Sequence, residues 1–156
     1  MMNVTCSKES TVAGAVIYDL FQKVGWILPK AQKPARHIKI DAISNHTIYL
    51  DPQDGSDFLQ KTFENSTSIH VAKSEGRIVG FVRVVSDRCQ RSVIYDLVVD
   101  PQYQRHGIGK RLVELCLEEF SHTQITLGTS TPTMGFYERL GFARSENYME
   151  IATEAY

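Results

Sequence analysis

A junction between a predicted strand and a predicted helix constrains this chain more than any other stretch. Ser92–Val99 is almost continuously apolar and β-branched, which predicts a strand buried on both faces. Apolar residues at helical spacing then run through Gly107–Phe120, which predicts an amphipathic helix packed on the sheet. The turn between these elements is basic and contains Gly107 and Gly109. A strand, a basic glycine turn and a helix in this order predict an anion-binding site.

The physical reason lies in the first turn of the helix. Its backbone N–H groups have no intrahelical partners, and the helix dipole adds partial positive charge at the same end. Gly107 and Gly109 have no Cβ, so an anion can come close to the backbone. Basic side chains cluster here, where the dipole would normally favour acids: Arg105, His106, Lys110 and Arg111. We therefore expect a phosphate-bearing ligand, with a solvated basic turn as the alternative.

Composition limits the function classes. The chain has 156 residues, a length that suits one domain over 1–156, and 17 Lys plus Arg balance 18 Asp plus Glu. A large basic surface for nucleic acid or an anionic membrane is therefore not expected. Cys6, Cys89 and Cys116 are too scattered for a disulfide framework or a zinc site, so we expect reduced thiols and no metal. We see no signal peptide or membrane span and expect a cytoplasmic protein.

Hydrophobic periodicity and turn residues predict the other elements along the chain. These are an edge strand at Asn3–Ser7, a helix at Thr11–Lys23, a loop at Ile27–Lys33, a hairpin of Arg36–Ile43 and Thr47–Leu50, a short helix at Phe58–Glu64, a strand pair of Ser68–Lys73 and Ile78–Val85, a strand at Gln124–Leu127, a short helix at Thr133–Leu140 and a last strand at Phe142–Ile151.

Two motifs in a fixed order resemble the GNAT superfamily, the GCN5-related N-acetyltransferases. Gln104–Gly109 matches the family's Q/R-x-x-G-x-G/A loop, which binds the pyrophosphate of acyl-CoA. Phe136–Phe142 matches the second motif, F-Y-x-x-x-G-F. The resemblance covers residues 69–144 well, 4–26 weakly and 27–57 hardly at all. It implies an α+β, three-layer fold: a mixed, mostly antiparallel twisted sheet, flanked by helices, whose central strand is splayed for acyl-CoA.

The resemblance also implies which residues hold acetyl-CoA as co-substrate. Backbone groups of the central strand would bind the pantetheine, a β-bulge would splay this strand from the next, and the N–H of Val98 or Val99 would stabilise the oxyanion. The family often has an asparagine before the last helix, whereas this chain has Gly128–Thr133, so a hydroxyl of Ser130 or Thr131 would substitute, or nothing would. The expected cofactor-binding residues are Leu97, Val98, Val99, Gln104, Arg105, His106, Gly107, Ile108, Gly109, Lys110, Thr131 and Phe136.

Tyr137 matches the tyrosine that many family members use as the general acid toward the leaving thiolate, and packing in the core is the alternative. Asp96 is the first candidate for the general base, because it is the only charge within the run Val93–Val99. Asp87 is the second candidate, with capping of a turn as its alternative role, and a water relay remains open. Val93 aligns with the glutamate of histone-type members, so that mechanism is excluded.

The expected reaction is direct acetyl transfer from acetyl-CoA to an amine, with a small amine favoured over a protein lysine. A CoA-binding regulatory domain without turnover, transfer of a longer acyl group and transfer to protein lysine are the alternatives. The segment 27–57 is longer than the usual connection between the first two helices and carries four basic residues: Lys30, Lys33, Arg36 and Lys39. We expect this atypical insert to shape acceptor choice or a homodimer contact, with a solvated loop as the alternative.

Overall fold

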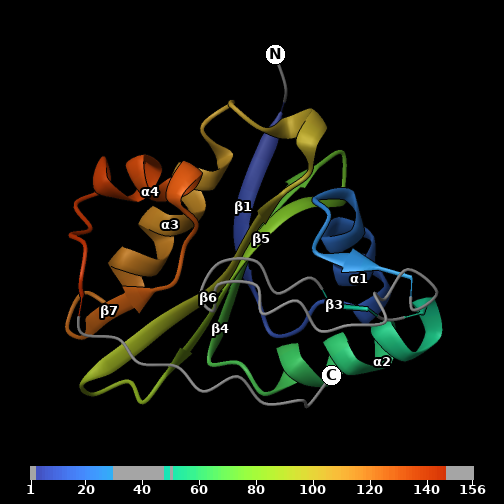
Figure 1. Cartoon of the computed structure of the whole chain (residues 1–156), viewed down its shortest axis with the longest axis horizontal. Coiled ribbons are helices and arrows are strands. Elements are labelled where there is room, and N and C mark those ends of the chain that lie inside the picture. The colour runs from blue at the N-terminus through green and yellow to red at the C-terminus, as the bar shows by residue number, and fades with distance from the viewer. Residues whose placement is uncertain (1–2, 30–47, 50, 147–156) are drawn as a thin grey trace.

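The computed structural model describes residues 3–29, 48–49 and 51–146 (Figure 1). Its elements, in chain order, are β1 (Val4–Glu9), α1 (Gly14–Lys23), β2 (Ile27–Leu28), β3 (Ile48–Tyr49), α2 (Pro52–Glu64), β4 (Ser68–Ser74), β5 (Arg77–Ser86), β6 (Arg91–Val99), the 3₁₀ helix η2 (Pro101–Tyr103), α3 (Ile108–Glu119), β7 (Gln124–Leu127) and α4 (Thr131–Glu138). None of the helices in these ranges combines the length and the apolar character needed to cross a membrane.

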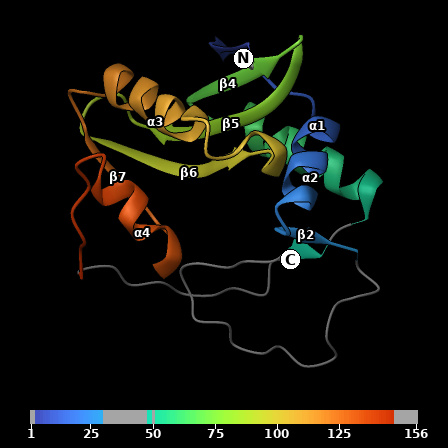
Figure 2. The same ribbon diagram turned by 90° about the horizontal axis from the view of Figure 1, so that it is seen from above.

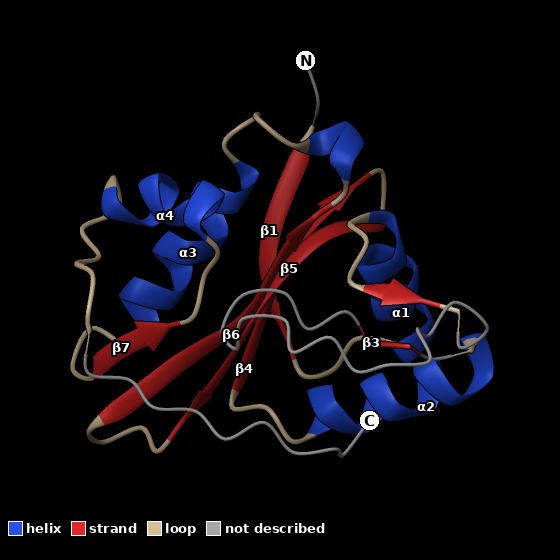
Figure 3. Cartoon of the chain, in the orientation of Figure 1, coloured by secondary structure: helices blue, strands red, loops and turns tan. Residues whose placement is uncertain are grey.

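The main sheet has the strand order β1-β4-β5-β6-β7, and all neighbours are antiparallel except β6 and β7. Helices α1 and α2 lie together beside the central strands, and α3 and α4 lie on the other side (Figures 1 and 3). One apolar core joins α1 and α2 to Phe81 and Val98, and a second joins α3 to Val82, Val84 and Ile94. The predicted α+β, three-layer fold with a mixed, mostly antiparallel sheet is therefore confirmed.

A β-bulge interrupts β6 at the centre of the sheet. Arg83 of β5 lies opposite Asp96, but the next residue, Val84, lies opposite Ile94, so Tyr95 has no partner on β5. The inserted residue explains why Ile94 and Leu97, three apart, both pack in the core beneath α3. The bulge expected near this point of the central strand is present.

The bulge coincides with the point where β6 separates from β7. The two parallel strands pair from Arg91–Gln124 to Ile94–Leu127 and no further. Beyond Ile94 they diverge, and Figure 2 shows β7 and α4 turning away from β6. Within the described ranges, no strand pairs with this edge of β6 from Tyr95 to Val99. The central strand is thus splayed as expected.

Most predicted elements are confirmed, with boundary shifts of up to three residues, and β7 matches its prediction at both ends. The second helix starts at Pro52 rather than Phe58, because proline is favoured in the first turn of a helix. The predicted loop at Ile27–Lys33 is wrong at its start, since Ile27–Leu28 forms β2.

Three further predictions differ from the structure. Ile48–Tyr49 pairs in parallel with β2, and the rest of the predicted hairpin lies outside the described residues. Residues 142–146 form no strand, and the remainder of the predicted last strand is also outside that range. Burial of the central strand on both faces is wrong, because Tyr95 is 58% exposed. Tyr95 is the inserted residue of the bulge and has no partner on β5.

Candidate functional site

The turn before α3 has the backbone geometry of an anion-binding loop. Gly107 is the N-cap of α3 and takes a left-handed conformation with φ of 80°. Arg105 is also left-handed, with φ of 64°, which is uncommon for a residue with a side chain. Such turns direct successive N–H groups into one concavity. The first turn of α3 holds no acidic residue that would repel an incoming anion.

Two anchors hold this loop against the end of β6. The side-chain amide of Gln104 donates a 2.9 Å hydrogen bond to the backbone oxygen of Val99. Asp100, which is buried, accepts from the backbone N–H of Gln102 at 3.0 Å and from Lys23 Nζ of α1 at 2.9 Å. Burial opposes ionisation of Asp100, but these two donors outweigh it, and its pKa lies below the usual value. These hydrogen bonds fix the start of the loop relative to β6 and α1.

The basic side chains at the loop point in different directions. Arg105, His106 and Lys110 are exposed, and Lys110 Nζ is 3.7 Å from Glu114 one turn along the helix. Arg111 pairs with Glu118 at 2.8 Å, so its guanidinium points along α3 and away from the loop. Of the four clustered basic residues, these first three are placed to meet an anion.

Gly109 brings several predicted cofactor residues together. A Cβ added to it would lie 3.7 Å from Phe136, 3.8 Å from Val99 and 3.9 Å from Leu97. The start of α3, the end of β6 and the middle of α4 therefore meet at this residue. Ile108 is buried in the core beneath α3, so its contribution to the loop is its backbone.

The separated edge of β6 offers free backbone groups. Neighbouring residues of a strand direct their backbone groups to opposite edges, and Asp100 donates its N–H to Val79 of β5. By this alternation Val98 faces β5, whereas Leu97 and Val99 face the open edge. Val98 is accordingly a poorer candidate for oxyanion binding than sequence reasoning suggested. The backbone oxygen of Val99 already accepts a hydrogen bond from the side-chain amide of Gln104.

Tyr137 lies on α4, which flanks the open edge. Its ring is 4.9 Å from that of Phe136 and 5.8 Å from that of Phe142, both edge to face. Burial raises the pKa of its phenol to about 12. The phenol is therefore protonated at neutral pH. Thr131 begins α4 and is exposed, while Ser130 Oγ is bonded to Thr133 Oγ1 at 2.9 Å.

The structure places the two candidate bases far apart. Asp96 is bound through Oδ2 to Nε of Arg83, on the sheet face that α1 and α2 cover. Asp87 Oδ1 accepts three backbone N–H groups, from Cys89, Gln90 and Arg91, in the turn between β5 and β6. The bonds from Arg91, Cys89 and Gln90 lower the pKa of Asp87. Capping of the turn accounts for Asp87.

Arg83 and Lys23 were missed by sequence reasoning. Arg83 is the only charged residue in the apolar run Ile78–Val85, and Asp96 is the only one in Val93–Val99. Two single charges of opposite sign in neighbouring strands indicate an ion pair, and this was the sequence signal available for Arg83. No pattern linked Lys23 to Asp100, because their contact depends on how α1 packs.

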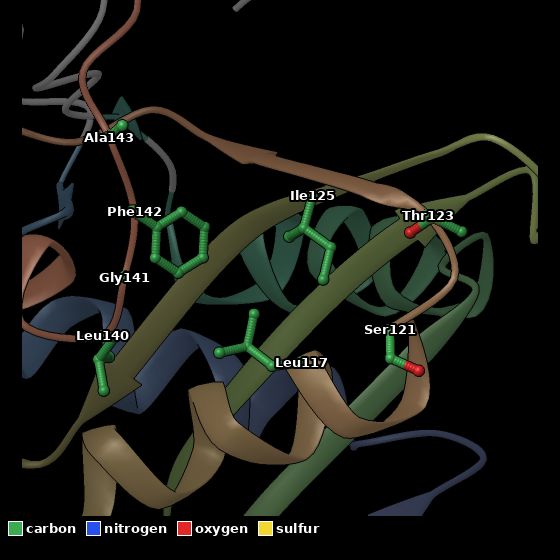
Figure 4. Close-up of a pocket in the computed structure, with 8 residues that line it drawn as sticks. All are labelled: Leu117, Ser121, Thr123, Ile125, Leu140, Gly141, Phe142 and Ala143. Carbon is green, nitrogen blue, oxygen red and sulfur yellow. The ribbon is translucent and has the colours of Figure 1, made fainter.

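A separate hollow of about 340 Å³ lies between the end of α3, β7 and the segment after α4. Figure 4 shows Leu117, Ile125 and Phe142 pointing into it. Its remaining lining residues are Ser121, Thr123, Leu140, Gly141 and Ala143. None of the predicted site residues lines this hollow, so it is distinct from the loop and the open edge.

A splayed central strand next to an anion-binding loop fits an acyl-CoA, and comparison with known proteins decides the family. A family model described as an acetyltransferase (GNAT) domain matches residues 35–152. The chain belongs to the GNAT acetyltransferase family. Among solved structures, a GNAT family acetyltransferase from Streptococcus pneumoniae superposes with a TM-score of 0.71 at 25% identity, covering 97% of this chain and 100% of that one.

Two more proteins are similar to this GNAT chain. A chloroplastic GCN5-related N-acetyltransferase 2 from Arabidopsis thaliana is 34% identical over 139 residues, which are 81% of this chain and 49% of that protein. A predicted acetyltransferase from Clostridium acetobutylicum, solved with acetyl-CoA, has a TM-score of 0.62 at 13% identity and covers 97% and 96% of the two chains, a likeness of fold alone. The chain spans 49% to 68% of the length of several curated relatives.

Proposed function

We propose that this GNAT protein transfers an acetyl group from acetyl-CoA to an amine by direct attack, without an acyl-enzyme. The observation that carries the proposal is the junction of the anion-binding loop with the open edge of β6 at Gly109. A ligand with a pyrophosphate at one end and an amide-containing arm at the other suits this junction. The acetyl-CoA in the structure from Clostridium acetobutylicum supports the choice of cofactor.

Residues of the loop hold the pyrophosphate in this proposal. The N–H groups of the first turn of α3 bind phosphate oxygens, and Arg105, His106 and Lys110 neutralise their charge. Outward backbone groups of Leu97 and Val99 bind the arm of the cofactor. Gln104 acts by fixing the loop, since its amide is bonded to Val99.

The transfer step moves one acetyl group and two protons. The nitrogen of a neutral amine forms a bond to the thioester carbonyl carbon, and an outward N–H of Leu97 or Val99 stabilises the oxygen as it becomes negative. The carbon–sulfur bond then breaks, and Tyr137 donates its proton to the leaving sulfur. The proton released by the amine passes to water or to the free oxygen of Asp96. Solvent restores the proton of Tyr137.

We propose a small amine as the acceptor, rather than a protein lysine or a nucleic acid. The balanced charge of the chain, 17 basic against 18 acidic residues, supports this choice. The segment 27–57 would shape the acceptor site or a homodimer contact. The free thiols of all three cysteines fit a reducing compartment, for which we propose the cytoplasm.

Acetyl-CoA titration by calorimetry, followed by free-thiol release across amines, amino acids, polyamines and lysine peptides, tests the function. Binding with turnover on a small amine is the expected result. Turnover on lysine peptides alone would replace the small amine with a protein acceptor. Binding without turnover on any acceptor would favour the CoA-binding regulatory domain, and absence of binding would refute the proposal.

A further inference from the structure

One side chain contacts both residues of the bulge in β6. Arg83 Nε donates to Asp96 Oδ2, and the guanidinium carbon lies 5.0 Å from the centre of the Tyr95 ring. Asp96 is the partner of Arg83 in the strand register, and Tyr95 is the inserted residue. The charged pair thus sits at the position where the register shifts.

Residues of α2 and of the turn that follows it also contact the guanidinium of Arg83. Its guanidinium carbon is 5.4 Å from the centre of the Phe63 ring, and its NH1 is 3.4 Å from Ser66 Oγ. Phe63 is 1% exposed and belongs to the core between α2 and the sheet. The side chains of Arg83 and Asp96 are 12% and 17% exposed, so water screens their interaction little. Arg83 therefore connects a rigid core to the bulge.

The register at this point decides what the open edge of β6 presents. A shift by one residue would exchange the inward and outward sets of side chains and would reverse which backbone groups face the edge. In the observed register the backbone groups of Leu97 and Val99 face the open edge, and the side chain of Val98 is buried in the core that α1 and α2 form with the sheet. The side chain that fixes the bulge therefore also fixes the direction of the groups assigned to the acetyl-CoA arm.

We propose that Arg83 is a positioning residue that holds the bulge of β6 in register through Asp96 and Tyr95, and that Asp96 is its anchor rather than the general base. The acceptor proton then passes to water. This inference rests on the proposed acetyl transfer only for its kinetic consequence. Its structural part concerns the protein without ligand.

A double-mutant cycle on Arg83→Met and Asp96→Asn tests the pairing. If the two residues act as one unit, each single variant lowers kcat by about tenfold to a hundredfold, and the double variant loses no more than either single one. The decrease of kcat at low pH occurs at the same pH as in the wild type. The Kd for acetyl-CoA rises by only a few fold, because Leu97 and Val99 lose contacts to the arm while the phosphate loop is untouched. Arg83→Lys retains part of the activity, since it keeps the charge and loses the planar fork.

Amide hydrogen exchange gives a readout that does not depend on turnover. In the unliganded single variants, exchange at Asp96 and Val98, whose backbone groups face β5, is expected to be faster, while exchange at Val71 in β4 stays unchanged. If a single variant fails to fold, the double variant Arg83→Met with Asp96→Leu, which leaves no unpaired charge, carries the same measurement. Unchanged exchange in β6 would overturn the proposal even if no acceptor amine were found.

A second ion pair in the same sheet provides the matched control. Lys73 pairs with Glu9 at 2.7 Å, next to another register shift, between Ala72 and Lys73. Lys73→Met and Glu9→Gln are expected to leave kcat and exchange in β6 unchanged. An equal loss from these variants would overturn a specific role for Arg83. A much larger loss in Asp96→Asn than in Arg83→Met, with the decrease of kcat at low pH removed, would make Asp96 the base. No thiol release from the wild type with any amine would instead refute the acetyl transfer.

Discussion

The side-chain amide of Gln104 donates a 2.9 Å hydrogen bond to the backbone oxygen of Val99 and so closes the phosphate loop onto the last residue of β6. Val99 also faces the edge where β6 has separated from β7. One hydrogen bond therefore couples the two halves of the proposed cofactor site. In the proposed complex with acetyl-CoA, Gln104 fixes the loop and does not itself bind phosphate.

Gln104→Ala is expected to weaken acetyl-CoA binding by about fivefold to tenfold, since a hydrogen bond of this kind contributes on the order of 1 kcal/mol. Thermal stability should change little, because Gln104 is exposed. Calorimetric titration provides the measurement. Gln102→Ala is the control, two residues away and also exposed, and should bind as the wild type does. Equal affinity in both variants would remove the anchoring role.

The two loop glycines should respond differently to substitution. Gly107 needs its positive φ, and a Cβ there would meet nothing within 4 Å, so backbone strain and not crowding is the problem. Gly107→Val should therefore distort the loop and abolish measurable acetyl-CoA binding. Gly107→Asn should keep most of the affinity, since asparagine tolerates the left-handed region.

Gly109→Ala is the companion variant. Its Cβ would make ordinary contacts of 3.7 to 3.9 Å with Phe136, Val99 and Leu97, so the protein should fold and bind acetyl-CoA within about threefold of the wild type. Calorimetry and thermal unfolding check both glycines. Normal binding by Gly107→Val would contradict the phosphate-loop assignment.

Local sequence signals were sufficient for the parts of the fold with clear periodicity. The strand pair β4 and β5 meets at Glu75 and Gly76, both with positive φ, as the turn residues indicated. The start of α2 was missed, because Asp51–Asp57 contains a proline, a glycine and mostly polar residues, which read as a loop. Tertiary packing adds to the preference of proline for a first turn: a Cβ on Gly14 of α1 would lie 2.0 Å from the backbone oxygen of Ser56, so the two helices pack closely.

The site was predictable only as far as its motifs reached. Gln104–Gly109 identified the loop, and Phe136 with Tyr137 identified the helix beside it. The partner of Asp96 was not predictable, since Arg83 lies in another strand and the pairing depends on register. Exposure of Tyr95 follows from the bulge, which hydrophobicity alone does not reveal.

Tyr137→Phe is expected to lower kcat by about a hundredfold with the Kd for acetyl-CoA unchanged, if the phenol protonates the leaving thiolate. Because burial raises the pKa of Tyr137 to about 12, no loss of activity from its ionisation should occur below about pH 10. Tyr103→Phe, in η2, is the control and should keep full activity. Steady-state kinetics over pH provide the measurement, and full activity of Tyr137→Phe would assign the residue to packing.

A polar cluster at the C-terminal end of α3 determines how the free energy of unfolding changes as the pH falls. Glu119 Oε2 accepts from Ser68 Oγ at 2.7 Å and lies 2.9 Å from His70 Nε2, and Oε1 lies 2.6 Å from Lys8 Nζ. Burial opposes ionisation of Glu119, but these partners outweigh it and bring its pKa to about 2. Burial lowers the pKa of His70 more than Glu119 raises it. The folded protein therefore favours an ionised glutamate beside a neutral histidine.

Both shifts predict loss of stability on acidification. The unfolded chain takes up a proton at His70 below about pH 6.5 and at Glu119 below about pH 4.5, while the folded protein resists both until lower pH. The contribution of Glu119 is fully present above about pH 4.5 and is lost as the pH falls toward 2; it should amount to on the order of 2 kcal/mol. Urea unfolding at pH 7, 5 and 3 measures this. Glu119→Gln should flatten the fall between pH 5 and 3, whereas Glu118→Gln, on the exposed face of α3, should retain it; identical curves for the two variants would contradict the role of the cluster.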